Sequence, residues 1–219
     1  SISGWSVDSV TVATVDASER LDPETAYYLE ITDGPLAGQR VEIDVQASTD
    51  EALAVNWGAA HNTIHAVPEA SDWLDAKAVV RPHWTLGDAY AKDAFIGSVN
   101  PESADQLLFF NGVDYESYFL LKGEGYHRWV AQDDDTLASA DAHIIPPGIG
   151  SFIRRPEGAE LLTLTLTGEA RSGSFVQPLV SGYNLLASPR PVDMSFRDRL
   201  FLIEDGFTGS RDPDLADQI

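Results

Sequence analysis

The chain has 219 residues, a formal net charge of −21 at pH 7 and no cysteine. The missing cysteines exclude disulfide bonds, thiolate metal sites and thiol nucleophiles. The negative charge excludes nucleic acids and anionic membranes as expected partners, because both repel an acidic surface. No apolar run approaches the roughly 18 residues that a membrane-spanning helix needs, so no membrane insertion is expected. A hydrophobic content of 43% is enough for a sizeable core, and the length predicts one large or two small domains.

The first 78 residues predict a small antiparallel β domain. Strands are expected at residues 5–16, 26–32, 39–45 and 52–57. In the first of them, four valines alternate with Ser, Thr and Asp, as in a half-buried strand. A short helix is expected at residues 68–76, with Pro68 in its first turn and Trp73 and Leu74 facing inward. Short strands joined by tight turns are typical of a small barrel or sandwich.

Residues 79–189 predict a second antiparallel β module. It opens with a short helix from Leu86 to Lys92. The Thr85 hydroxyl is expected to cap the first turn, and the Asp88 side chain, three residues on, to reach back to Thr85. Strands are then expected at residues 106–110, 116–121, 126–132, 150–155, 161–167, 175–180 and 184–187. Gly-rich and Pro-rich turns separate these strands, which indicates a mainly β fold.

The sequence Pro146-Pro147-Gly148 predicts a rigid turn within this module. The two prolines restrict φ, and glycine readily adopts the positive φ that other residues avoid. We therefore expect a positive φ at Gly148, and we expect the turn to direct Phe152 into the core of the module.

The end of the chain repeats part of the second module. Phe95 to Leu107 and Phe207 to Ile219 share Phe, Gly, Ser, Pro, Ala, Asp and Gln at the same spacing. A match of this length indicates internal duplication. The expected organisation is therefore an N-terminal β domain (1–78), a central β module (79–189) and the opening of a second copy (190–219). The fold class is mainly β, a small antiparallel barrel or sandwich followed by an antiparallel module with short capped helices.

An ordered set of motifs carries a family resemblance. The motifs are Gly34-Pro35-Leu36-Ala37-Gly38, Trp84-Thr85-Leu86-Gly87, Ala104-Asp105-Gln106-Leu107-Leu108-Phe109-Phe110, Ile145-Pro146-Pro147-Gly148, Phe152-Ile153-Arg154-Arg155 and Asn184-Leu185-Leu186-Ala187-Ser188-Pro189. Over nearly its whole length the chain resembles a family of uncharacterised secreted β-rich repeat proteins of the Verrucomicrobia type. The resemblance implies export, repetition of the Pro-Pro-Gly module and continuation past residue 219. It implies no catalytic residues.

The environment of the protein is inferred from charge and from the N-terminus. Residues 1–5 have neither the basic region nor the apolar core of a signal peptide, so we expect that any such peptide has been removed or never existed. An acidic surface suits a saline, divalent-rich setting, because salt screens its self-repulsion. We expect an extracellular or cell-surface protein, with an acidic cytoplasmic protein as the alternative.

Three groups of residues are candidates for binding. Calcium takes clustered carboxylate oxygens, so Asp133, Asp135 and Asp141 are its candidate ligands, with a solvated acidic loop as the alternative. An aromatic strip that could stack on a sugar is expected from Tyr115, Tyr118, Tyr126 and Trp129, with core packing as the alternative. The pair His61-x-x-x-His65 has the spacing of two zinc ligands on a helix, but no Glu follows His61, which favours separate loop histidines.

No catalytic motif stands out. A nucleophile elbow, a phosphate-binding Gly loop and a dinucleotide fingerprint are all missing from the sequence. We therefore expect a secreted structural protein that assembles head-to-tail with copies of itself, with no cofactor except calcium. The C-terminal repeat would supply the contact, through Phe196, Leu200, Phe201 and Phe207, with packing of residues 190–219 on their own chain as the alternative. A carbohydrate-binding or adhesive module is the alternative, and a glycoside hydrolase using two of the carboxylates is a third.

Overall fold

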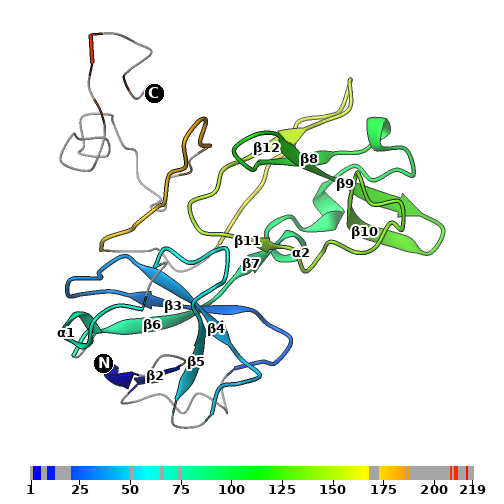
Figure 1. Cartoon of the computed structure of the whole chain (residues 1–219). Coiled ribbons are helices and arrows are strands. Elements are labelled where there is room, and N and C mark those ends of the chain that lie inside the picture. Colours follow the sequence, from blue (N-terminus) through cyan, green and yellow to red (C-terminus); the bar gives the residue numbers. More distant parts are fainter. Residues whose placement is uncertain are drawn as a thin grey trace. The chain divides into compact units, whose positions relative to one another are not determined.

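The computed structural model describes residues 2–5, 9–12, 21–49, 52–64, 67–73, 75–167, 173–185, 187, 208, 210, 211 and 216. The chain divides into two compact units, Ser1–Pro189 and Arg190–Ile219. All helices and strands in the described residues belong to the first unit (Figure 1). Its described strands form antiparallel sheets of six, four and two strands, which confirms the predicted mainly β fold.

The N-terminal part forms the six-stranded sheet. In spatial order, its strands are β1 (Ile2–Trp5), β2 (Ser9–Val12), β5 (Leu53–Asn56), β4 (Arg40–Asp44), β3 (Tyr27–Ile31) and β6 (Ala78–Pro82). Among the described residues β1 and β6 do not pair, so the sheet does not close into a barrel. The prediction of one strand over residues 5–16 was wrong. The chain reverses between β1 and β2, which then pair with each other, and a count of alternating residues does not detect that reversal.

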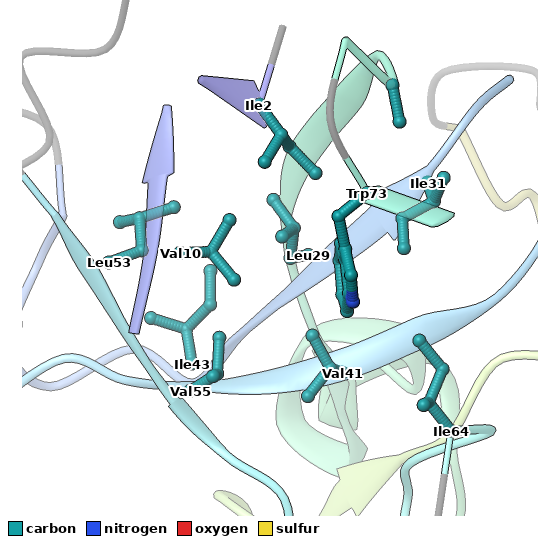
Figure 2. Packing of buried hydrophobic residues seen from close by; sticks show 11 residues of the cluster. Ile2, Val10, Leu29, Ile31, Val41, Ile43, Leu53, Val55, Ile64 and Trp73 are labelled. Carbon is teal, nitrogen blue, oxygen red and sulfur yellow. The ribbon is translucent and has the colours of Figure 1, made fainter. Parts of the chain in front are cut away.

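One face of this sheet carries the first hydrophobic core. Figure 2 shows the indole of Trp73 pointing into a cluster of strand residues that includes Leu29, Ile31 and Val41. Trp73 ends helix α1 (Ala70–Trp73) and is fully buried, as expected from the sequence. Burial of side chains of this size contributes about 1.5–3 kcal/mol each. The expected domain boundary near residue 78 lies at the first residue of β6, which extends this sheet to Pro82.

The central part forms the four-stranded sheet. Its strands lie in the order β10 (Tyr126–Ala131), β9 (Tyr115–Gly123), β8 (Gln106–Phe110) and β12 (Ser151–Arg154). All four had been predicted at these positions within a few residues. One face packs Leu107, Leu120 and Trp129 into a second core, and each of these side chains is fully buried.

A two-stranded ladder and short helices join the two larger sheets. Strand β7 (Trp84–Thr85) pairs with β11 (Ile144–Ile145) and leads into α2 (Leu86–Ala89). Thr85 Oγ1 accepts a hydrogen bond from the backbone N–H of Asp88 at 3.2 Å, which confirms the predicted cap. The helix ends at Ala89 rather than Lys92 and is followed by two 3-10 turns, η1 (Lys92–Ala94) and η2 (Pro101–Ser103).

Three predictions for the region after β11 have different outcomes. Gly148 has a φ of 87°, as expected. Phe152 does not enter the core, because it lies on the opposite sheet face from Leu107 and is 50% exposed. The strands expected at residues 161–167, 175–180 and 184–187 are not formed by the residues described there. In the first of these stretches Leu162 and Leu164 pack on the second core, but none of the described strands pairs with its backbone.

No helix in the described part of the chain is long and apolar enough to cross a membrane.

Candidate functional site

The four aromatic residues proposed as a ligand strip are divided between the two faces of the four-stranded sheet. Tyr118 and Trp129 are directed into the second core, with exposed fractions of 7% and 0%. Tyr115 and Tyr126 lie on the opposite face and are 44% and 48% exposed. The division follows from the register, in which Tyr118 and Trp129 share a face with Leu107 and Leu120. They do not form one continuous surface.

An exposed group of aromatic side chains does occur on the face that carries Tyr115. We call Phe110, Tyr115 and Phe152 the aromatic rim. The Tyr115 ring centroid lies 5.2 Å from that of Phe110 and 6.0 Å from that of Phe152. Phe110 faces Tyr115 across β8 and β9, and Phe152 comes from β12, which is an edge strand of this sheet. The rim therefore combines exposed apolar surface with a strand edge that no other described strand occupies.

The carboxylates proposed for calcium are in different environments. Asp141 accepts hydrogen bonds from Lys92 Nζ at 2.6 Å and from the Trp129 N–H at 2.9 Å, so both its oxygens have protein partners. Asp133 and Asp135 are exposed. Their neighbour Asp134 accepts from Thr136 Oγ1 at 2.6 Å, and this hydrogen bond is the main cause of its lowered pKa. In the described residues no three His, Asp or Glu side chains converge to hold a metal ion.

The second face of the six-stranded sheet carries charged side chains that the sequence analysis missed. We call these residues the charged layer: Glu30, Arg40, Glu42, Arg81 and His83. Arg81 Nε donates to Glu30 Oε2 at 2.5 Å, and the Glu30 side chain is only 3% exposed. His83 Nε2 lies 2.8 and 2.9 Å from the two oxygens of Glu42. In β3 and β4, alternation along the sequence correctly assigns polar and apolar residues to opposite faces of the sheet. The polar face is nevertheless also shielded from solvent, since Glu30 and Arg40 are buried.

Part of the cover comes from far along the chain. Arg40 donates through one NH group to the carbonyl oxygen of Val176 at 3.0 Å, and its guanidinium lies 4.5 Å from the ring centroid of Phe175. The Val176 N–H also donates to the carbonyl oxygen of Gly38 at 3.1 Å. The segment Phe175–Gln177 therefore crosses the charged layer and shields Arg40 from water.

Two of the five histidines, His61 and His83, lie near each other, which the sequence did not reveal. The ring centroids of His61 and His83 are 6.2 Å apart. Burial is the main cause that lowers the pKa of His61; Glu42 opposes this shift, while His83 and His143 add to it. His65, the other half of the suspected zinc pair, lies outside the described residues. The charged layer could have been found from the sequence by one signal. The turn at 33–38 places Glu30 opposite Arg40 and Tyr28 opposite Glu42, so these residues share one polar face of the sheet.

His143 also interacts with the phenol of Tyr118. The Tyr118 hydroxyl lies 3.2 Å from His143 Nδ1 and 3.4 Å from Glu116 Oε2. Burial, followed by the Glu116 charge, raises the pKa of Tyr118 to about 12. Burial lowers the pKa of His143, against the opposing influence of Glu116. A neutral imidazole beside a neutral phenol can form a hydrogen bond that stabilises the fold.

The residues expected to form an assembly contact, Phe196, Leu200, Phe201 and Phe207, lie outside the described part of the chain. Comparisons with models of protein families, with curated proteins and with solved structures give no match for this chain.

Proposed function

We propose that the protein is a non-catalytic structural component of the cell surface or extracellular space, which assembles with copies of itself into a filament, sheath or surface layer. The observation that carries this proposal is the aromatic rim. Phe152 is 50% exposed and Tyr115 44% exposed, and their rings contact each other beside the β12 edge. Exposed apolar groups of this kind mark surfaces that become buried in an interface.

The charged and titratable groups have partners that suit a structural role. Glu30 and Arg81 form an ion pair, and Glu42 holds His83. Hydrogen bonds between largely buried charged groups, such as those of Glu30 and Glu42, help to fix the arrangement of neighbouring strands. The internal duplication supports a homotypic partner, because it indicates that modules of one kind follow one another. The C-terminal segment with Phe196, Leu200, Phe201 and Phe207 would provide a further contact in a head-to-tail arrangement.

Carbohydrate binding is the second candidate, because exposed aromatic rings can also stack on sugars. The rings of the rim are inclined to one another by 53° and 63°, so they do not present a common flat platform. This inclination favours a protein surface, in which side chains interlock from several directions, over the flat face of a pyranose ring.

Light scattering over a range of protein concentrations tests the proposal. The double variant Tyr115→Ser, Phe152→Ser should weaken self-association by at least about tenfold, since each 1.4 kcal/mol of lost apolar burial is a factor of ten. Tyr126→Ser is the matched control, because Tyr126 is an exposed tyrosine of the same sheet that does not belong to the rim. A wild-type chain that stays monomeric and binds a glycan on an array would overturn the structural proposal in favour of the second candidate.

A further inference from the structure

Residues 161–167 have the most regular strand pattern in the chain but form no strand. The sequence Leu-Leu-Thr-Leu-Thr-Leu-Thr alternates at period two and carries no charge. Leu162 and Leu164 pack against the second core, while Thr163, Thr165 and Thr167 are exposed. Within the described chain, no residue forms a hydrogen bond with the backbone of this segment. Seven consecutive residues are thus held in place on one side, with their N–H and C=O groups available to another strand.

A groove of about 190 Å³ runs beside this segment. One wall consists of residues 163–167. The opposite wall consists of Trp84, Asp88, Ala89, Ala91 and Ala94. The three alanines are small, so the groove leaves space for side chains of an incoming extended chain. Backbone groups along one wall and side-chain space along the other are the two requirements for binding by strand addition.

We infer that residues 161–167 pair with the same residues of a second copy, as antiparallel strands related by a twofold axis at Leu164. This inference rests on the proposed self-association and identifies a contact separate from the aromatic rim. In this register Thr163 lies opposite Thr165 of the second copy, and Leu162 lies opposite Leu166. Leucines then meet leucines on one face. On the other face Thr163 meets Thr165 at the centre, and Leu161 meets Thr167 at each end; the leucine and threonine pairs are favourable cross-strand pairs. A twofold contact of this kind needs only one self-complementary surface.

The distribution of charge also favours pairing with residues 161–167 of a second copy. At a net charge of −21, most contacts between copies bring acidic groups together. Residues 161–167 carry none, and in the proposed register the flanking Glu160 lies opposite Gly168 rather than opposite another carboxylate. Like charges placed directly opposite would destabilise the pair, so this register avoids the repulsion that the rest of the surface would create.

The missing cysteines allow a sharp test of the register. We would prepare Thr163→Cys and Thr165→Cys separately, on two exposed positions, and oxidise each alone and in a mixture with oxidised glutathione. Directly opposite residues have Cα atoms about 4.5–5.5 Å apart, within disulfide range. Identical positions would be diagonal neighbours about 7–8 Å apart, outside that range. The mixture should therefore cross-link at least about tenfold faster than either variant alone.

Val113→Cys serves as the control for collisions, because Val113 is 92% exposed and lies outside the segment. Cross-linking at the same rate in the mixture, in the single variants and in the control would overturn the inference. If the wild-type chain still self-associates in that case, the proposed function stands and only the contact is wrong. A wild-type chain that neither self-associates nor cross-links overturns both.

Hydrogen exchange of the amides of residues 161–167 provides a second measurement. Their exchange should slow by at least about tenfold as the protein concentration rises through the range of self-association, because pairing protects the N–H groups. Protection that is already complete in dilute monomer would overturn the inference, since the strand partner would then belong to the same chain.

Discussion

Gly38 and Gly148 lie far apart in the sequence but contact the same residue, Phe175. A Cβ atom at Gly38 would lie 2.9 Å from the backbone nitrogen of Phe175, and one at Gly148 would lie 2.8 Å from its Cζ atom. The segment that covers Arg40 can approach closely at both glycines, one in the turn between β3 and β4 and one in the Pro-Pro-Gly turn. This explains the glycine in each motif by close packing as well as by its positive φ, which is 90° at Gly38 and 87° at Gly148.

This packing predicts the effect of adding a side chain at the turn. Gly148→Val should destabilise the protein by about 1–3 kcal/mol through backbone strain, and the collision with Phe175 adds to that cost. Gly158→Val is the matched control, because Gly158 has a φ of 77° but no neighbouring atom within 4 Å of an added Cβ. Urea unfolding of both variants measures the difference. Equal losses in the two variants would show that the contact with Phe175 contributes nothing.

The charged layer predicts that breaking a buried ion pair costs more folding stability than breaking an exposed one. Glu30→Ala should destabilise the fold by about 3–5 kcal/mol, because it leaves the guanidinium of Arg81 in a covered position without its carboxylate. Glu102→Ala should cost at most about 1 kcal/mol, since the ion pair of Glu102 with Arg154 is largely exposed. Thermal or urea unfolding measures both values. A small loss for Glu30→Ala would mean that water enters the layer.

Tyr118 predicts a loss of stability at alkaline pH. Its pKa is raised to about 12 in the folded chain, from about 10 when unfolded, so the folded state binds the phenolic proton more tightly. The stabilising contribution is complete below pH 10 and is lost as the pH rises through about 12. Unfolding measured between pH 9 and 12 should therefore show a steeper loss for the wild type than for Tyr118→Phe. Parallel curves for the two proteins would contradict the shift.

Net charge predicts how assembly depends on salt. At a charge of −21, copies repel one another before they make contact, and screening shortens this repulsion to about 10 Å at 0.1 M salt. Self-association measured by light scattering should therefore strengthen as NaCl or Ca²⁺ is added. Calcium should act more strongly at equal ionic strength if exposed carboxylates such as Asp133 and Asp135 bind it. Association that weakens steadily with salt would instead indicate a contact between opposite charges.

Local patterns were sufficient to locate many of the elements. Alternation identified β3 and β4 almost to the residue, because a strand with one apolar face places apolar side chains at every second position. A short apolar run between turn residues located β8. The Thr85 cap and the positive φ of Gly148 were also predictable, since both depend on a few neighbouring residues. The reversal between β1 and β2 was missed because the alternating valines begin at Val7, between the two strands, and show no break there.

The candidate surfaces depended on long-range packing. His61 and His83 come together only through the fold. Phe152 is 50% exposed because the packing that buries Phe119 and Leu121 on its face of the four-stranded sheet does not extend to it. The sequence by itself determined the mainly β character, the acidic surface and the alternation of faces, because these follow from composition and from neighbouring residues. Only the tertiary structure decided that Glu30 and Arg40 are buried and that residues 161–167 lack a strand partner in the described chain. Alternation separates the two faces of a strand, but distant segments decide which face and which edge are covered.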